Sequence, residues 1–426
     1  MLDINTLRNN QAAVIDGLKK RNLGPEIEDV IAKIVKLDDR RKTVQTELDQ
    51  QLALVNLKSR EIGELFKSGQ QDQAATLKSE VVEIKKAVKD METTLAQTIL
   101  EIETIVIDLP NVPHNSVKAG KGAEDNEITK ENLENMPRFE GITALPHWDL
   151  AEKYNLIDFK LGVKITGSGF PVFRGKGAKL ERGLIHFFLS EASEAGYEEI
   201  MPPLLVNEDT ARATGQLPDK EGQMYFVEKD NLYLIPTAEV PLTNLLRGDI
   251  LKRSELPVKL AGYTPCFRRE AGSYGSDVKG LNRVHQFDKV EIVQVADPAH
   301  SYQVLDEMVA HVEMLLQKLE LPYRILRLCG GDMGFTSALT FDFEVYSAAQ
   351  EKWLEVSSVS NFETFQSNRL KLRFRDGDEK PQLVHTLNGS ALALARIMAA
   401  ILENNQDAEG VKIPRVLHSF TGFDRI

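Results

Sequence analysis

Two runs of apolar residues with a heptad rhythm lie near the N-terminus of the chain. Their apolar or near-apolar positions recur at steps of three and four, which is the seam of a coiled coil. The first run comprises Ile27, Ile31, Ile34, Leu37, Val44, Leu48, Leu52, Val55, Ile62 and Leu65, and the second comprises Leu77, Val81, Ile84, Val88, Met91, Leu95, Thr98, Ile102, Ile105 and Leu109. Between them, Gly69 suits a helix end and a tight turn. The pattern predicts two antiparallel helices in an arm of roughly 60 Å, at ~1.5 Å rise per residue.

The predicted arm has two interpretations. It could be a dimerisation or spacer coiled coil, or it could contact an anionic partner. The whole chain has a net charge of −12, which disfavours general nucleic-acid binding because phosphate attraction drives non-specific affinity. Residues 33–89, however, hold 12 Lys and Arg against 9 Asp and Glu. The outer arm is therefore the least acidic region, although a solvated helical face would look similar.

The remaining sequence indicates a second domain of mixed structure. Prolines and a lack of periodicity after Leu109 predict a linker over 111–140, which separates an arm domain, 1–110, from a domain spanning 141–426. Strand-like alternation mixed with helical segments at 178–195, 298–320 and 389–404 predicts an α+β fold on a mostly antiparallel sheet.

Cysteine content and targeting signals indicate the compartment. Cys266 and Cys329 lack CxxC spacing, so we expect buried thiols rather than a disulfide scaffold or a zinc site. The N-terminus has no apolar signal region, and the nearly apolar stretch 391–402 is too short for a membrane span and contains Arg396. These features predict a cytoplasmic protein without a membrane contact.

The segment 261–295 is the most informative part of the second domain. It predicts a hairpin in which two strands flank a Gly- and Ser-rich tip. On its second strand, period-2 geometry places Arg283, His285, Phe287, Lys289 and Glu291 on one face, and Arg268 and Glu270 share a face on the first strand. A guanidinium binds phosphate, an aromatic ring stacks a purine and a carboxylate takes an ammonium. The alternative is a solvent-facing strand pair with cross-strand ion pairs.

Three further pieces carry polar groups. A helix predicted to begin near residues 388–390 is apolar from Ala391 to Leu402 except at Arg396, which needs an anion, either an internal carboxylate or a bound phosphate. Thr237 and Glu239 share a face if their segment is extended. The run 355–358, Glu-Val-Ser-Ser, offers hard oxygen ligands of the kind that Mg²⁺ prefers. Since GxxxxGK[ST] and GxGxxG motifs are missing, side chains would have to hold any nucleotide.

In this order the pieces resemble the seryl-tRNA synthetases. The resemblance is carried by TAE at 237–239, FRRE at 267–270, GLNRVHQFDKVE at 280–291, EVSS at 355–358 and HTLNGSALALAR at 385–396. The N-terminal MLDI, the arm, LPNVPH at 109–114 and GYEEIMPPLLVN at 196–207 also match, so the resemblance covers nearly the whole chain. It implies a class II synthetase sheet flanked by helices and a ligase that consumes ATP with Mg²⁺.

The resemblance also implies a role for each matching residue. Arg268 would bind the ATP α-phosphate and the serine carboxylate region, Arg283 and Arg396 the β- and γ-phosphates, and Phe287 the adenine; Glu355 and Ser358 would ligate Mg²⁺; Thr237, Ala238, Glu239, Glu291 and Ser390 would form the serine pocket; and Arg269, Glu270, Val356 and Ser357 would complete the ATP site. The family usually has Ser at the position of Arg269, which we expect to point away. Shared ligation by Glu355 and Ser358 requires their strand to end near Ser357. The run 361–366 lacks an expected aspartate and is left out of the site.

Partners follow from the same resemblance. They are L-serine, tRNA(Ser), tRNA(Sec) as a further candidate, and a second copy of the chain that pairs around Pro202, with each arm serving tRNA on the other subunit. The rival interpretations are a relative that loads a carrier protein, a coiled-coil interaction protein on an inactive synthetase scaffold, and an enzyme with threonyl or prolyl specificity. The long, partly basic arm argues against the first. The presence together of Arg268, Glu291, Glu355 and Arg396 argues against the second, and the arm and the TAE loop argue against the third.

Overall fold

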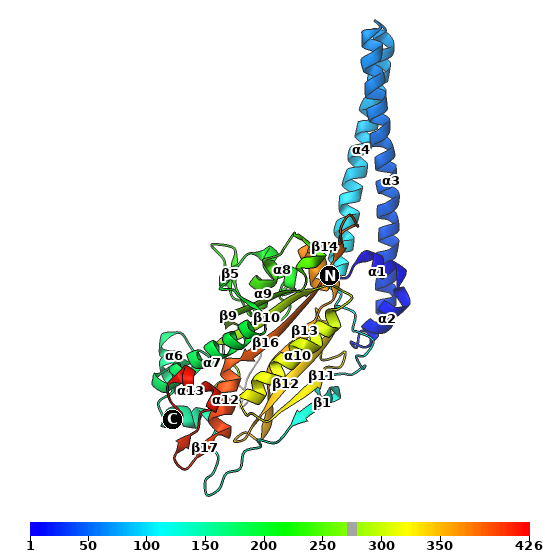
Figure 1. Cartoon of the computed structure of the whole chain (residues 1–426). Helices are drawn as coiled ribbons and strands as arrows, with labels where there is room; N and C mark the ends of the chain where they lie inside the picture. The colour runs from blue at the N-terminus through cyan, green and yellow to red at the C-terminus, as the bar shows by residue number, and fades with distance from the viewer. Residues whose placement is uncertain (271–278) are drawn as a thin grey trace. The chain divides into compact units, whose positions relative to one another are not determined.

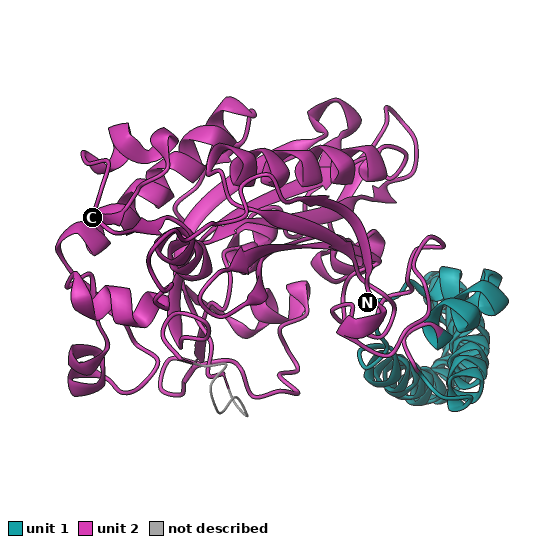
Figure 2. Cartoon of the chain, turned by 90° about the horizontal axis from the view of Figure 1, so that it is seen from below, with its two compact units in different colours: residues 1–19, 23–110 teal, residues 20–22, 111–426 magenta. Residues whose placement is uncertain are grey.

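The computed structural model describes residues 1–270 and 279–426. The chain divides into two compact units, which Figure 2 colours separately. The first comprises residues 1–19 and 23–110, and the second comprises residues 20–22 and 111–426. The predicted tip of the hairpin, 271–278, lies outside the described residues.

The first unit is helical and contains the predicted arm (Figure 1). Helices α1 (Ile4–Asn9) and α2 (Gln11–Lys19) precede the long helices α3 (Glu26–Lys67) and α4 (Gln71–Val106). The long helices pack antiparallel along buried heptad residues such as Ile31 and Val88. The turn between them contains Gly69 with φ of +78°, a conformation that glycine adopts without steric cost. The predicted arm is confirmed.

The seam of the arm also contains a buried acid that the heptad pattern passes over. The Asp38 side chain is 1% exposed and pairs with Arg8 at 2.9 Å, Arg41 at 2.8 Å and Lys42 at 3.3 Å. Burial alone would raise the pKa of Asp38, but these cations outweigh it and lower the pKa. Asp38 therefore ties α1 to α3 through charge where an apolar residue would otherwise lie.

The second unit is built on an eight-stranded sheet, ordered β1-β11-β12-β13-β16-β10-β9-β4. Its strands are β1 (Glu127–Asn132), β4 (Glu198–Glu199), β9 (Val258–Phe267), β10 (Gln286–Ala296), β11 (Tyr323–Arg327), β12 (Leu339–Ser347), β13 (Lys352–Asn361) and β16 (His385–Ala393). All neighbours are antiparallel except β4 and β9. The predicted α+β fold on a mostly antiparallel sheet is confirmed.

Three helices pack against one face of this sheet: α7 (Gly175–Glu194), α10 (Ser301–Lys318) and α12 (Leu394–Asn404). Val290 and Ile292 of β10 point into the apolar core that these helices share with the sheet. The intervening residues Phe287, Lys289 and Glu291 face the opposite side, as period-2 geometry predicts. The helices predicted over 178–195 and 298–320 are present with slightly shifted ends.

Two expectations differ from the structure. The predicted linker 111–140 contains strand β1, an edge strand of the sheet with mostly exposed side chains and therefore without an apolar alternation. The helix predicted from residues 388–390 begins only at Leu394, because His385–Ala393 forms a strand between β10 and β13. The apolar stretch from Ala391 begins in the last residues of β16 and continues through α12, and periodicity alone does not distinguish the end of a buried strand from a buried helix. The helix therefore begins later than predicted, although Arg396 still lies in it.

Smaller elements complete the second unit. They are the helices α5 (His147–Lys153), α6 (Phe159–Ile165), α8 (Glu208–Thr214), α9 (Glu239–Asn244), α11 (Thr364–Leu370) and α13 (His418–Thr421), and the strands β2 (Ile157–Asp158), β3 (Val172–Phe173), β5 (Leu205–Val206), β6 (Phe226–Val227), β7 (Leu232–Leu234), β8 (Ile250–Lys252), β14 (Arg373–Arg375), β15 (Gln382–Leu383), β17 (Gln406–Asp407) and β18 (Gly410–Val411). Cys266 and Cys329 are buried free thiols, as predicted. Within the described ranges, no helix is both long and apolar enough to cross a bilayer.

Candidate active site

A cavity of about 640 Å³ opens on the face of the sheet that bears Phe287, Lys289 and Glu291. The predicted site residues that line it are Thr237, Glu239, Arg268, Glu270, Arg283, Phe287, Glu291, Glu355, Val356, Ser357, Ser358, Ser390 and Arg396. These residues come from segments far apart in the sequence. Their convergence on one cavity is the spatial arrangement that the motif order implied.

Two predicted residues lie outside this lining. Ala238 is fully buried at the N-terminal end of α9 and does not line the cavity. The guanidinium carbon of Arg269 lies 5.8 Å from the ring centre of Tyr225, and its backbone N–H donates to the carbonyl of Gln223. Arg269 thus points away from the cavity, as strand alternation predicted, and its inclusion in the ATP site is not supported by this geometry.

The hairpin supplies the cationic and aromatic part of the cavity. The guanidinium carbon of Arg268 lies 5.3 Å from the ring centre of Phe287, within cation–π range. Arg283 pairs with Glu270 at 3.1 Å across the hairpin. The sequence placed His285 on the same face as Phe287. In the structure its ring instead stacks on Phe170, and its Nδ1 shares a hydrogen bond with the Tyr225 hydroxyl. It precedes β10, so the alternation of that strand does not extend to it.

A buried carboxylate, Glu291, also lines the cavity. Its side chain is fully buried and pairs with Lys289 at 2.6 Å. Asn388 donates to one carboxylate oxygen at 2.9 Å, and the Ser390 hydroxyl lies 3.3 Å from the other. Asn388 was missed by the sequence interpretation because β16 was taken for a helix. In a strand, Asn388 shares a face with Ser390, which lies directly opposite Glu291.

A second buried acid of the cavity, Glu239, is affected by the negative charge of Glu291. Burial, together with the charge of Glu291, raises the pKa of Glu239 to about 7. Gln366 donates to its carboxylate at 2.7 Å. The sequence interpretation left residues 361–366 out of the site, yet Gln366 holds Glu239, and Phe362 lines the cavity. The Thr237 hydroxyl accepts from the backbone N–H of Glu239 at 3.2 Å and so orders the turn into α9.

Arg396 lies at the start of α12 and reaches the same cavity. Its Nη1 donates to the backbone carbonyl of Glu355 at 2.6 Å, and its Nε donates to the carbonyl of Asn282 at 3.2 Å. The Glu355 carboxylate is farther away, at 3.8 Å. With 28% of its side chain exposed, Arg396 is oriented by carbonyls and keeps a face toward the cavity. A positive group held in this way suits an incoming anion.

A β-bulge explains how Glu355 and Ser358 both line the cavity. Glu344 pairs with Glu355 while Phe343 pairs with Ser357, so Val356 is the extra residue on β13. The bulge shifts the alternation by one residue. The expectation that the strand ends near Ser357 was therefore wrong, since β13 continues to Asn361.

The bulge also places the two residues next to Asp342 of β12, an acid that the sequence interpretation missed. The Ser358 hydroxyl donates to the Asp342 carboxylate. Burial and the neighbouring Glu355 raise the pKa of Asp342 well above its usual range. A divalent cation would relieve this repulsion, and two carboxylates with a hydroxyl are donors that suit Mg²⁺. In the described part of the chain, no group of three or more His, Cys, Asp or Glu residues could hold a metal alone.

Comparison with known proteins identifies the class. Residues 225–405 match the family model of the class II tRNA synthetase core domain for G, H, P, S and T, and residues 1–113 match the seryl-tRNA synthetase N-terminal domain. The fold of a Giardia lamblia prolyl-tRNA synthetase, 17% identical, is similar with a TM-score of 0.56 over 63% of this chain and 54% of that one. The antiparallel sheet and its cavity are therefore a class II synthetase core.

More similar proteins define the branch. The chain is 47% identical to a serine--tRNA ligase of Salinibacter ruber over 100% of this chain and 99% of the relative, and 46% identical to that of Methylacidiphilum infernorum over 99% of both. A seryl-tRNA synthetase of Pyrococcus horikoshii, whose structure was solved with ATP, has a TM-score of 0.91 and 36% identity, covering 100% of this chain and 99% of that one. The chain belongs to the seryl-tRNA synthetase family.

Proposed function

We propose that this chain is a serine--tRNA ligase, which activates serine with ATP and transfers it to the 3′-end of tRNA(Ser). The observation that carries the proposal is the convergence of Arg268, Arg396, Phe287 and Glu291 on one cavity. The similarity to serine--tRNA ligases over the full chain and to a synthetase solved with ATP supports it.

The first reaction follows from the chemistry of the lining. The serine carboxylate attacks the α-phosphate, forming a mixed anhydride and releasing pyrophosphate. Arg268 neutralises charge at the α-phosphate, Arg283 and Arg396 bind the β- and γ-phosphates, and Phe287 stacks the adenine. Such transfer depends on positioning and charge neutralisation, so a protein nucleophile is not needed. A hydroxyl of the terminal tRNA ribose then attacks the carbonyl and releases AMP.

Serine selectivity would reside at the acidic end of the cavity. Glu291 receives the substrate ammonium, and this new contact would replace part of its ion pair with Lys289. Thr237, Glu239 and Ser390 offer hydrogen bonds to the hydroxyl and the backbone of serine. Alanine would leave these buried groups unpaired, which costs more than the loss of contact area alone.

A magnesium ion fits the acidic corner of the site. Glu355 and Ser358 would hold it, with Asp342 beside them, and phosphate oxygens of the nucleotide would complete its coordination because the protein donors are few. When bound, Mg²⁺ neutralises charge on the phosphates.

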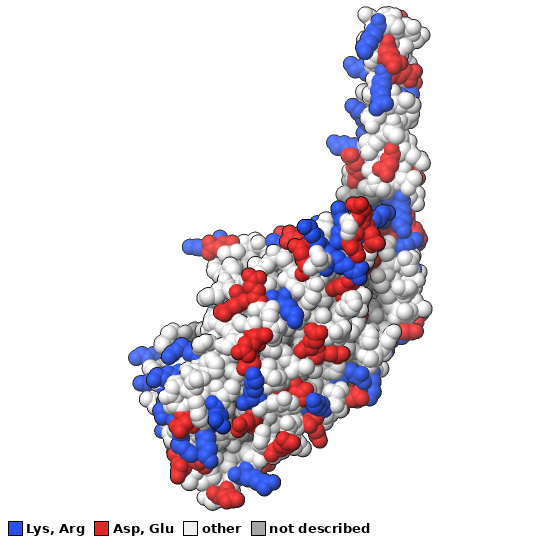
Figure 3. Space-filling model, viewed as in Figure 1, with Lys and Arg blue, Asp and Glu red and all other residues white. Residues whose placement is uncertain are grey.

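The arm would recognise tRNA by its outer part and act on tRNA bound to the other subunit of a homodimer. On the face of the arm visible in Figure 3, Lys and Arg side chains are interspersed with Asp and Glu. A surface of mixed charge is better suited than a uniformly basic one to recognising the shape of tRNA through a few local phosphate contacts.

For the dimer, we propose pairing around Pro202, next to which Met201 is 86% exposed. A cytoplasmic location is part of the same proposal, and charging of tRNA(Sec) is an additional activity to assay.

Pyrophosphate exchange with each of the twenty amino acids tests the proposal. Exchange should depend on serine, and exchange with threonine or proline instead would refute the assignment.

Arg268→Ala should abolish exchange, whereas near-normal exchange would remove Arg268 from the site. Deletion of residues 33–89 should preserve exchange and abolish charging of tRNA. Retained charging would show that the arm does not recognise tRNA, and transfer to a carrier protein instead would favour that rival.

A further inference from the structure

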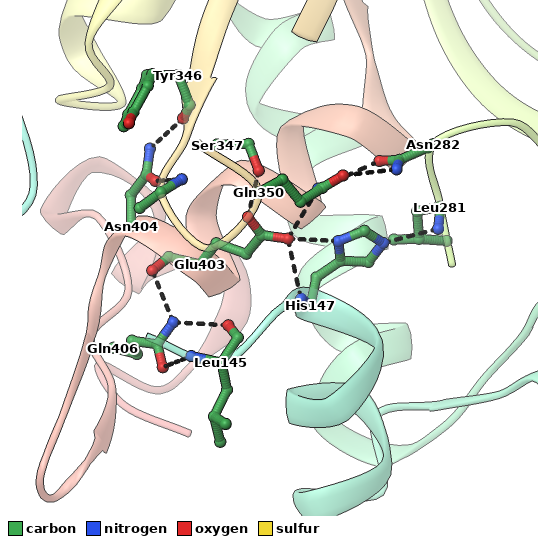
Figure 4. A network of polar contacts seen from close by, with 11 residues as sticks. Leu145, His147, Leu281, Asn282, Tyr346, Ser347, Gln350, Glu403, Asn404 and Gln406 are labelled. Atoms are coloured by element: carbon green, nitrogen blue, oxygen red, sulfur yellow. Dashed lines mark hydrogen bonds and ion pairs between the residues drawn. The ribbon is translucent and has the colours of Figure 1, made fainter. Parts of the chain in front are cut away.

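A network of buried polar side chains that was not predicted as part of the site contacts Leu281 and Asn282 (Figure 4). Its centre is Glu403 near the end of α12, which accepts hydrogen bonds from Nδ1 of His147 at 2.7 Å, from the backbone N–H of His147 at 3.0 Å and from Nε2 of Gln350 at 3.0 Å. Ser347 donates a further hydrogen bond to it. Burial alone would raise the pKa of Glu403, but the hydrogen bonds from His147 and Ser347 outweigh it and lower the pKa.

The network contacts residues 281 and 282, which lie shortly after the described chain resumes at residue 279. The backbone N–H of Leu281 donates to Nε2 of His147 at 2.8 Å. Nε2 must therefore accept, which leaves the ring proton on Nδ1, directed at Glu403. At Gly280, which has φ of +67°, a Cβ atom would lie 2.2 Å from the same nitrogen. Glycine is thus required for the backbone to approach His147 this closely.

The next residue is held as well. The buried Asn282 side chain makes two hydrogen bonds to Gln350. Its Nδ2 donates to Oε1 of Gln350 at 2.8 Å, and its Oδ1 accepts from Nε2 of Gln350 at 3.5 Å. Gln350 in turn donates to Glu403, so it bridges Asn282 and the buried acid. Figure 4 shows Leu281 and Asn282 reached by His147 and Gln350 from separate elements.

The anchored residues are part of the cavity. Leu281 and Asn282 line it, and Arg283 follows immediately in the chain. The backbone carbonyl of Asn282 accepts the hydrogen bond from Nε of Arg396 at 3.2 Å. The same short segment therefore precedes Arg283 and directly orients Arg396.

We propose that His147, Glu403 and Gln350 are positioning residues for the triphosphate end of the site. They fix residues 280–282, and through these they orient Arg283 and Arg396 toward the β- and γ-phosphates. The inference rests on the proposed function, because it requires that ATP fills this end of the cavity. Within the described residues, Glu239 bonds to Gln366 and Glu291 bonds to Asn388 and Ser390, and none of these contacts includes His147, Glu403 or Gln350. Loss of the network should therefore weaken ATP binding and leave serine binding unchanged.

The test is steady-state pyrophosphate exchange by the full-length Gln350→Ala variant. Its KM for ATP should rise about tenfold, which is the size of effect seen when outer-shell partners of a functional group are removed. Its KM for serine should change less than twofold. Gln317→Ala is the matched control, because it removes two glutamine hydrogen bonds, to Glu313 and Tyr323, outside the cavity lining. The control should leave both KM values unchanged.

A second pair of variants separates positioning from folding. In His147→Gln, the side-chain oxygen can still accept from Leu281 N–H, whereas His147→Leu leaves that buried donor unsatisfied. ATP KM should be lower in the glutamine variant than in the leucine variant. Unchanged ATP KM in Gln350→Ala, or a parallel rise of both KM values, would overturn the inference. Neither result would affect the proposed function, which fails instead if the wild-type chain does not exchange pyrophosphate in the presence of serine.

Discussion

The buried acid Glu239 should make the stability of the second unit depend on pH. Its pKa is raised from 4.5 to about 7 in the folded chain, mainly by burial and then by the charge of Glu291. Between these pH values the folded state retains a proton that the unfolded state has released. The free energy of unfolding therefore falls as pH rises through this window, and it falls by about 3 kcal/mol at ~1.4 kcal/mol per pKa unit. The penalty is absent below the unfolded pKa and complete above the folded pKa.

Glu239→Gln isolates this contribution, because glutamine keeps an oxygen that can accept from Gln366 but does not titrate in this range. We expect the variant to gain about 3 kcal/mol relative to wild type between about pH 4.5 and pH 8. Urea unfolding monitored by tryptophan fluorescence measures this change. The chain has two tryptophans, Trp148 and Trp353, and both lie in the second unit, which contains the cavity. Glu208→Gln, at an ion pair on α8 with 41% of the Glu208 side chain exposed, is the control and should show little change. A pH-independent difference for Glu239→Gln would refute a raised pKa at this site.

Three further outcomes are expected. Asp38→Ala should destabilise the arm by about 1 to 3 kcal/mol, because it removes a buried acceptor to which three cations bond, and an unchanged thermal transition by circular dichroism would contradict this. Glu355→Gln should raise the Mg²⁺ concentration needed for half-maximal exchange about tenfold, whereas an unchanged requirement would remove Glu355 from the metal site. Cys266 and Cys329 should react with a thiol reagent only after unfolding, because both are buried and burial raises the pKa of Cys266; rapid reaction of the native chain would contradict their placement.

Features with a clear period could be predicted from the sequence. The heptad seam defines the arm, and the alternation along residues 287–291 places Phe287 and Glu291 on the cavity face. Two kinds of feature could not be predicted in this way. The apolar stretch that begins at Ala391 runs from the end of β16 into α12 without a change of pattern at the boundary, and the bulge at Val356 has no sequence period.

The missed residues act through tertiary contacts. Gln366 belongs to the site only because it reaches Glu239, from which it is separated by 127 positions, and Asn388 belongs to it only because β16 lies beside β10. Glu403 and His147 are 256 positions apart and meet in the core. Residues of this kind become visible only when the sheet brings distant segments together.

The proposal that the hairpin, β13 and α12 surround one nucleotide can be tested by a crystal structure of the chain with a stable seryl-adenylate analogue. We expect the adenine on the ring of Phe287, the phosphate mimic within hydrogen-bond distance of Arg268, and the serine amine at Glu291. An analogue bound elsewhere, or bound here with its serine amine remote from Glu291, would show that this cavity is not the adenylate site.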